Sequence, residues 1–516
     1  MHPRSVRHLT APPDYNGTLG NKVSTVSNTR SFFNKKPNEY RCGPRVECGA
    51  DTQRVQLMIK NWSSRWLELP HKQTFALAGP MILANISVPL MGLADTAMLG
   101  HLDDAAFVGA VAVGANIFAF MFWMMAFLRM GTTSVVGQAL GANNPTTAFD
   151  QLAQSAALAF GLAALLIITH PFTLPLAISW VAADPQVAEL AAQYASIRIY
   201  AAPAVLGTYV LSGWLLGLQK PVYTLIITVA INTINIALDY VFILKFNWGS
   251  QGAAAASVCA DYLGFAIALF CFYYSAKQIQ LFKRAPNWRW LSALRQGNWR
   301  KLMGINRDLF IRTAILLFVF NFFTAQGGDL GQTTLAANAI LIQLMFLSTY
   351  ALDGYAHAAE TLAANAIGAK NLHKLHNTSI AACSTAGFIA VFMAVLFWFG
   401  QPLFIWLMTD IHEVKQAVAQ FYIWLCVMPI VAVWCYLFDG IFIGAGKTRA
   451  LRNWMLAAVL LVFLPSWWLL QPLANHGLWI AFVVFHIARS ISLGYEYYRC
   501  TVRNSWFATS SKVDAC

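Results

Sequence analysis

Carboxylate and amide side chains lie within strongly apolar stretches of this chain. Asp95 stands among leucine, alanine and methionine residues, and Asn235 and Asp239 are four positions apart in a second stretch. Residues four apart share one helix face, and their oxygens are hard ligands that suit Na⁺ or hydronium. We therefore predict ion binding at Asp95 and at the Asn235–Asp239 pair, with Asp261 as a plausible neighbour. The alternatives are a solvated helix end for Asp95 and a hydrogen bond that only joins helices for Asn235 and Asp239.

A second set of titratable residues follows helical spacing later in the chain. Asp353, His357 and Glu360 occupy positions i, i+4 and i+7, which place them on one face. Such a stripe could relay protons or line a cleft for a cationic substrate; buried hydrogen bonds between helices are the alternative. Asp439, in a further apolar stretch, has the same possible roles.

Four basic or acidic residues within or near apolar stretches need partners. Asp308 and Arg312 are four residues apart, and this spacing predicts an internal ion pair. We expect Arg129 and Arg198 to pair with carboxylates or to extend toward the membrane surface, and we assign neither to a substrate.

The elements that carry these residues are membrane helices. Of the 516 residues, 58% are hydrophobic and 11% are charged, against about 25% charged in a soluble domain. Each apolar run is long enough to span the ~30 Å hydrocarbon layer. The predicted spans are 74–99, 107–138, 149–171, 190–217, 221–246, 252–276, 304–325, 334–366, 378–405, 416–444, 450–471 and 476–498.

Charged loops predict the orientation of these spans. Lys and Arg concentrate in loops after even-numbered spans, and Asp and Glu in loops after odd-numbered ones, with Lys245 and Lys415 as exceptions. The positive-inside rule then places both termini in the cytoplasm. Because the net charge of +13 arises from a polar tail and such loops, it does not indicate nucleic-acid binding.

Two copies of one helical unit make up the hydrophobic part. Residues 139–144 read ALGANN and residues 366–371 read AIGAKN, 227 positions later. The same offset pairs Gly213 and Gly217 with Gly440 and Gly444. Membrane-embedded repeats are typical of carriers. We predict an all-α fold with two six-helix lobes around a central cleft.

The lobes divide the chain into five regions. The N-lobe is predicted over 70–276 and the C-lobe over 304–498, joined by an amphipathic cytoplasmic connector over 277–303. Residues 499–516 are a predicted cytoplasmic tail. Residues 1–57 are polar and are expected to be either a disordered tail or an artefact of start-site choice.

Patterns typical of enzymes and metal sites are absent from the sequence. The nine cysteines contain no close CxxC pair, and no HExxH, GxSxG or phosphate-binding loop occurs in a plausible context. We expect a carrier without enzymatic activity.

Several motifs carry a family resemblance. They are AGPMI at 78–82, GLADTAMLGHLD at 92–103, FLRM at 127–130, GWLLG at 213–217, NTINIALD at 232–239, NRD at 306–308, YALDG at 350–354 and WCYLFDG at 434–440. From about residue 70 onward the chain resembles the multidrug and toxic compound extrusion family, and within it the branch named for DNA-damage-inducible protein F.

The resemblance implies a V-shaped cleft, export of organic compounds in exchange for H⁺ or Na⁺, and no cofactor beyond that ion. It implies that Asp95, Asn235 and Asp239 share one cation site, with Pro80 as a hinge in the first helix. A static kink at Pro80 is the alternative. The resemblance also implies a multi-pass bacterial inner-membrane protein, a monomer in contact with lipids. A lipid or polyprenyl-linked flippase of the same superfamily is the alternative. Only a minority of the candidate cleft-lining residues can face the cleft, because such residues are more often lipid-facing or packed. The candidates are Phe118, Phe120, Met121, Phe122, Trp123, Met124, Met125, Met345 and Phe346.

Overall fold

The computed structural model describes residues 69–99, 105–181, 184–281, 289–296 and 299–507. Side chains are described for the same residues apart from 90, 93–99, 105–108, 289–291 and 296. The predicted tail 1–57 lies outside the described residues, as do residues 508–516 of the predicted C-terminal tail.

Helices account for nearly all of the described chain, and no strand occurs among the described residues. In chain order the helices are α2 (His71–Leu99), α3 (Ala105–Met125), α4 (Phe127–Gly141), α5 (Pro145–Val181), α6 (Pro185–Arg198), η1 (Ile199–Ala201), α7 (Ala202–Gly217), α8 (Pro221–Asp239), η2 (Tyr240–Lys245), α9 (Gly249–Gln278), α11 (Arg289–Gln296), α12 (Trp299–Asp329), α13 (Gln332–Gly368), α14 (Leu372–Met408), α15 (His412–Gly444), α16 (Thr448–Ala457), η3 (Ala458–Phe463), α17 (Leu464–Leu469), η4 (Gln471–Leu473) and α18 (Ala474–Val502).

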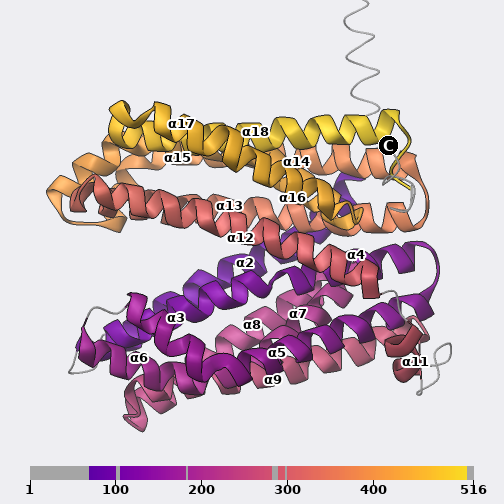
Figure 1. Ribbon diagram of the computed structural model, residues 1–516, viewed down its shortest axis with the longest axis horizontal. Coiled ribbons are helices and arrows are strands. Elements are labelled where there is room, and N and C mark those ends of the chain that lie inside the picture. The colour runs from indigo at the N-terminus through magenta and orange to yellow at the C-terminus, as the bar shows by residue number, and fades with distance from the viewer. Residues whose placement is uncertain (1–68, 100–104, 182–183, 282–288, 297–298, 508–516) are drawn as a thin grey trace, which may run out of the picture. The chain divides into compact units, whose positions relative to one another are not determined.

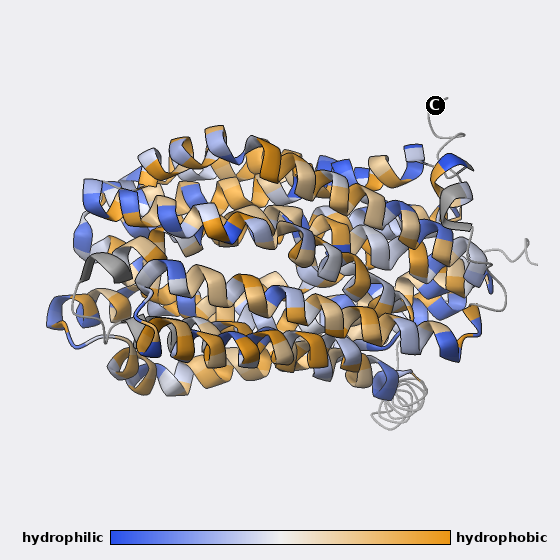
Figure 2. Cartoon of the chain, turned by 90° about the horizontal axis from the view of Figure 1, so that it is seen from below, coloured by the Kyte–Doolittle hydropathy of each residue, from blue (hydrophilic) through white to orange (hydrophobic). Residues whose placement is uncertain are grey.

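These helices match the predicted membrane spans. Among the described residues, eleven helical stretches are long and apolar enough to cross a membrane, and α2 precedes them as a further helix of 29 residues. Their outer faces expose large apolar side chains such as Phe172, Trp180 and Phe399. Hydrophilic residues gather at the two ends of the helices, with hydrophobic ones along the length between (Figure 2). The prediction of an all-α polytopic membrane protein is confirmed.

The helices form two lobes, as the repeat predicted. Helices α2 to α9 make the N-lobe and α12 to α18 the C-lobe, drawn as the lower and upper layers in Figure 1. The lobes meet through α2 and α4 of the first and α12, α13 and α15 of the second. In the connector, α11 packs on α5, where Gln154 Nε2 donates to the Ala293 carbonyl oxygen over 3.0 Å. Helix α12 already begins at Trp299, inside the predicted connector 277–303.

The repeated glycines are the points where helices cross most closely. A Cβ atom on Gly213 would lie 2.6 Å from the Arg129 carbonyl oxygen, and one on Gly440 would lie 2.2 Å from that of Ala356. Arg129 and Ala356 are themselves 227 positions apart. The repeat therefore conserves one crossing in each lobe: α4 with α7, and α13 with α15.

Close backbone packing at glycine residues also joins the two lobes to each other. A Cβ atom on Gly141 would lie 2.2 Å from the Asn365 carbonyl oxygen, and one on Gly368 would lie 2.0 Å from that of Gln138. Backbones that approach so closely tolerate only glycine. Helices α4 and α13 therefore meet about a pseudo-twofold axis, which closes this end of the space between the lobes.

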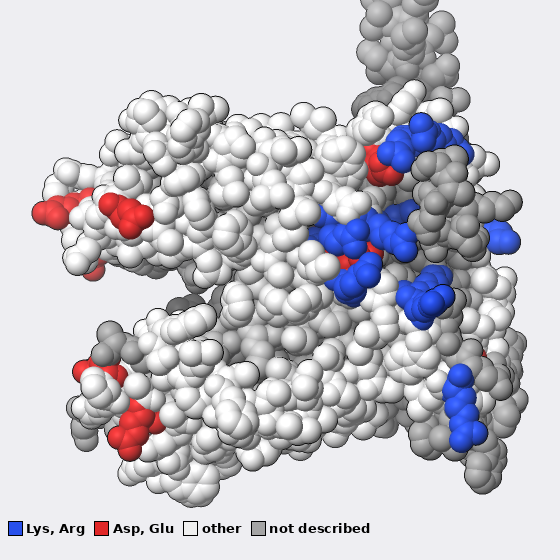
Figure 3. Space-filling view, viewed as in Figure 1, with Lys and Arg blue, Asp and Glu red and all other residues white. Residues whose placement is uncertain are grey.

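The opposite end is open and acidic. Acidic side chains gather at the far tips of the two lobes and basic ones at the joined end (Figure 3). Between the acidic tips, this face of the protein is hollowed by a cleft (Figure 3).

Candidate functional site

Two of the predicted ion ligands are buried on α8. Asn235 and Asp239 are each 2% exposed, and α8 packs on both α2 and α9. Asn235 Nδ2 donates to Ser257 Oγ of α9 over 3.3 Å. Asn235 Oδ1 is buried and accepts no hydrogen bond within the described part of the chain. An acceptor left without a donor in an apolar interior is costly, and a bound cation removes that cost.

The backbone changes its geometry at this point. Immediately after Asp239, α8 passes into the π-helical segment η2. Short π-helical segments occur often at functional sites because they redirect side chains out of the regular α-helical pattern. No residue spacing in the sequence predicted this feature.

Helix α2, which bears the predicted first-helix residues, lies against α8. It packs along α8, and Asn232 Nδ2 donates to Ser87 Oγ of α2 over 2.9 Å. Asp95 lies on α2, two turns after Ser87, but its side chain is outside the described residues. Helix α2 runs without a break through Pro80, so the predicted hinge lies within a continuous helix. The Ser87–Asn232 contact was not anticipated, although a polar pair within apolar stretches is a signal for it.

Asp261 has a partner of its own. Its Oδ2 lies 2.6 Å from Arg198 Nη1 at the end of α6, and the Arg198 guanidinium also lies 5.4 Å from the centre of the Phe122 ring. Asp261 follows Ser257 by one turn of α9. The expected pairing of Arg198 with a carboxylate is therefore present. Asp261 joins α9 to α6, beside the Asn235–Ser257 contact.

In the C-lobe, Asp439 lies between two arginines. Its Oδ2 binds Arg312 of α12 and lies 2.6 Å from Arg489 Nη2 of α18. Arg489 is 1% exposed, and its Nε and Nη1 atoms have no hydrogen-bond partner within the described residues. These contacts join α15 to α12 and α18, which indicates a structural role for Asp439.

The predicted Asp308–Arg312 ion pair is wrong. Asp308 Oδ1 lies 2.7 Å from Arg452 of α16 and 3.1 Å from Arg307, while Arg312 binds Asp439. Spacing along one helix could not reveal the contacts with Arg452 and Asp439, because these two residues come from helices far away in the sequence.

The titratable residues predicted to share one face of α13, which are Asp353, His357 and Glu360, lie toward the N-lobe. Arg129 Nη1 of α4 lies 3.0 Å from His357 Nε2 and 3.3 Å from His357 Nδ1. His357 Nδ1 in turn lies 3.4 Å from Glu360 Oε2. Asp353 is partly exposed one turn earlier, near the charges of Arg129 and Arg312. The shared face was predicted, but the contact across the lobes was not.

Few of the predicted cleft-lining side chains face the other lobe. The Trp123 ring lies 6.4 Å from Phe346 and 6.3 Å from Phe320, across the lobe boundary. Phe118 and Phe122 are buried in the N-lobe core and Met345 in the C-lobe core. Aromatic and methionine residues are common in membrane helices for packing alone, so composition could not separate the two roles.

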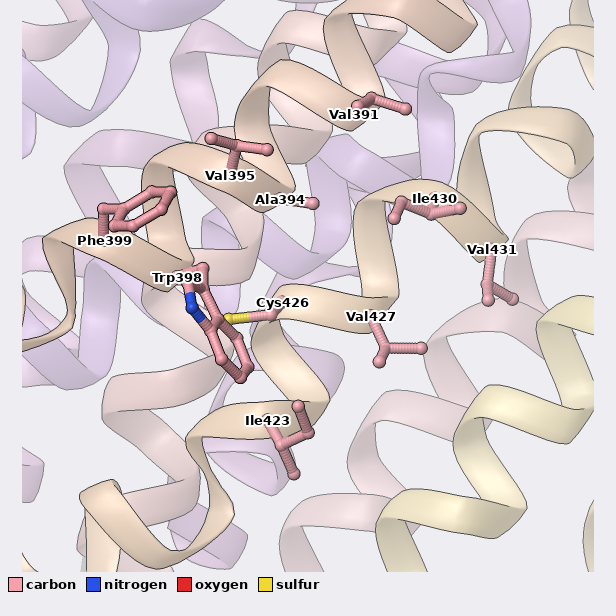
Figure 4. A pocket seen from close by; sticks show the side chains of 10 residues that line it. All are labelled: Val391, Ala394, Val395, Trp398, Phe399, Ile423, Cys426, Val427, Ile430 and Val431. Atoms are coloured by element: carbon pink, nitrogen blue, oxygen red, sulfur yellow. The ribbon is translucent and has the colours of Figure 1, made fainter.

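A wholly apolar groove lies elsewhere, between α14 and α15. Val395, Trp398, Cys426 and Val427 are among its lining residues (Figure 4). It holds no polar or charged side chain, and its walls include outward-facing residues such as Trp398 and Ile430. In a membrane such a groove is a surface for lipid chains. No group of three His, Cys, Asp or Glu residues positioned for a metal ion occurs within the described residues.

The two-lobed helical fold with a cleft between its repeats defines a polytopic membrane carrier. The MatE family model matches residues 80–241 and again residues 309–468, once in each lobe. The chain therefore belongs to the MatE family, the multidrug and toxic compound extrusion transporters.

Individual relatives agree with this assignment. The chain is 37% identical over 457 residues to DNA damage-inducible protein F of Escherichia coli K12, covering 88% of this chain and 98% of the relative. It is 23% identical over 452 residues to a probable multidrug resistance protein NorM of Pseudomonas syringae, covering 83% and 94%. The predicted family and branch are confirmed.

A solved structure shares the fold. It is the outward-facing conformation of a multidrug resistance MATE transporter of the MOP superfamily, with a TM-score of 0.75 and 19% sequence identity. The match covers 86% of this chain and 98% of that structure.

Proposed function

We propose that this protein is a secondary antiporter that exports lipophilic, often cationic small molecules in exchange for H⁺ or Na⁺. The coupling ion binds in the N-lobe at Asp95, Asn235 and Asp239. Family membership and the cleft between two repeat lobes support the carrier assignment.

The unsatisfied Oδ1 of Asn235 is the observation that carries the ion site. It lies one helical turn from the buried Asp239, and α8 packs on α2, which bears Asp95. Carboxylate and amide oxygens that converge in an apolar interior suit Na⁺ or hydronium. Asp261 and Asp439 are weaker candidates because arginines already compensate their charge.

Ion binding would act through α2. This helix packs on α8 within its own lobe and on α13 of the other lobe, where Asn85 Nδ2 donates to the Tyr350 carbonyl oxygen over 3.2 Å. Neutralising the N-lobe carboxylates changes which arrangement of α2 is most stable, and bending at Pro80 would transmit that change to the lobe boundary.

The charge distribution supports an orientation. The basic end (Figure 3) would face the cytoplasm under the positive-inside rule. Both termini would then be cytoplasmic in a bacterial inner membrane, and the cleft would open outward. A flippase would need free basic residues in the cleft, whereas Arg198, Arg312 and Arg489 are held by carboxylates.

Efflux from reconstituted vesicles tests the proposal. Lipophilic cationic dyes are loaded, and a proton or sodium gradient is imposed separately on the parent protein, on Asp95→Asn and on Asp410→Asn. We expect Asp95→Asn to lose gradient-driven efflux while its yield and membrane insertion stay unchanged. Asp410, whose side chain is 97% exposed at the acidic end, serves as the matched control and should behave like the parent. Efflux by Asp95→Asn at the parent rate would refute the assignment.

A further inference from the structure

Three polar side chains, of which His357 and Glu360 are buried, form a contact between the lobes. We propose that Arg129, His357 and Glu360 are an interlobe lock, which holds the basic end of the cleft closed and must break before that end can open. The proposal rests on the proposed function, because an antiporter must open its cleft to each side of the membrane in turn (alternating access). In this proposal Arg129 holds the two lobes in position. The family resemblance assigned no role to this residue.

The donors and acceptors of the lock are mutually consistent. An arginine only donates, so a His357 nitrogen must accept from Arg129 Nη1, and Nε2, at 3.0 Å, is the nearer. This assigns the proton of a neutral imidazole to Nδ1, which then donates to Glu360 Oε2 at 3.4 Å. The Arg129 guanidinium and the Glu360 carboxyl group are thereby bridged by one neutral imidazole ring.

Burial makes the contact strong while the lobes are together. His357 is 9% and Glu360 is 2% exposed, and Glu360 Oε1 has no hydrogen-bond partner in the described part of the chain. If the lobes part, His357 and Glu360 lose these contacts in an apolar interior, which is costly unless water reaches them. The lobes can therefore separate here only if water enters between α4 and α13.

The lock occupies the middle of a series of interlobe contacts. Toward the acidic end, Trp123 meets Phe346 at the boundary. Toward the basic end, Gln138 Nε2 of α4 donates to the Gly444 carbonyl oxygen of α15 over 2.8 Å. Arg129 lies between Trp123 and Gln138 along the chain, so the lock lies on the closed side of the aromatic contact.

Within the described residues, the other buried ion pairs do not cross the boundary. Arg198 and Asp261 both belong to the N-lobe, and Arg312 and Arg489 bind Asp439 within the C-lobe. Such pairs can travel with their lobe as a rigid unit. The partners of the lock belong to different lobes, so relative movement of the lobes must change their distance.

Spin-label distances across the basic end test the lock. Labels are placed on the exposed turns at Asn143 and Lys370, in a cysteine-free background of the full chain in lipid nanodiscs without gradient or substrate. We expect Arg129→Gln and Glu360→Gln each to raise the ratio of open to closed distances about tenfold, which corresponds to ~1.4 kcal/mol. The double variant should open no further than either single one, because both remove one contact.

Three controls keep the result interpretable. Arg198→Gln removes a buried arginine inside one lobe and should leave the distances as in the parent, while Arg129→Lys should restore most of the closed population. Thermal unfolding in the same nanodiscs identifies variants that fail to fold, for which His357→Gln is the substitute. Unchanged distances in folded Arg129→Gln and Glu360→Gln, or an equal change in Arg198→Gln, would overturn the lock. Because no gradient is applied, failure of the antiport proposal would leave this outcome unaffected.

Discussion

At the scale of single residues, charge compensation explains most of the polar groups inside this protein. Asp261, Asp308 and Asp439 each have an arginine within ion-pair distance. Asp439 is the most demanding case, because its carboxylate lies between the guanidinium groups of Arg312 and Arg489. Its removal would leave two cations in an apolar interior.

Replacement of Asp439 by alanine should therefore be severe. Breaking a buried ion pair from one side costs about 3–5 kcal/mol, so we expect a large fall in the thermal unfolding midpoint of Asp439→Ala in detergent. Asp410→Ala, at an exposed carboxylate, is the matched control and should unfold like the parent. Equal midpoints for the two variants would contradict the structural role of Asp439.

Residue spacing predicted which polar residues share a helix face better than it predicted which residues they contact. It placed Asn235 with Asp239, and His357 with Glu360, on common helix faces, since that depends only on helical periodicity. It failed for Asp308 and missed the Arg129–His357 contact, because those partners come from other helices. Ion binding by the side chain of Asp95 stays a prediction.

At the scale of helices, glycine decides how closely the elements approach. Gly440 lets α15 pack on α13 at the level of Ala356, and Gly213 does the same for α7 on α4. The repeat made these glycines recognisable in the sequence. Their role became clear only from the crossings, because the sequence does not show which backbone lies opposite each glycine.

A methyl group at Gly440 should therefore destabilise the C-lobe. Its carbon would lie 2.2 Å from the Ala356 carbonyl oxygen, and overpacking of this kind typically costs about 1–3 kcal/mol. We expect Gly440→Ala to lower the thermal unfolding midpoint. Gly161→Ala on α5, where nothing lies within 4 Å, should be neutral or slightly stabilising. The interpretation fails if the two substitutions have the same effect.

At the scale of the whole transporter, two similar lobes carry dissimilar charges. Long apolar runs and the 227-residue repeat were sufficient to predict the helices and their two-lobe arrangement, because membrane spans are set by length and hydrophobicity. The polar groups do not repeat: Asn235 and Asp239 belong to the N-lobe, and Glu360 and Asp439 to the C-lobe. We infer that the shared scaffold supplies the movement and the N-lobe site couples it to an ion.

Ion counterflow driven by substrate alone tests this central claim most directly. The protein is reconstituted into vesicles with no ion gradient, a gradient of tetraphenylphosphonium is imposed, and internal pH and Na⁺ are recorded. The account predicts that H⁺ or Na⁺ moves against the lipophilic cation in the parent protein and that Asp239→Asn abolishes this movement. Tetraphenylphosphonium flux without ion movement, or equal ion movement in Asp239→Asn, would contradict it.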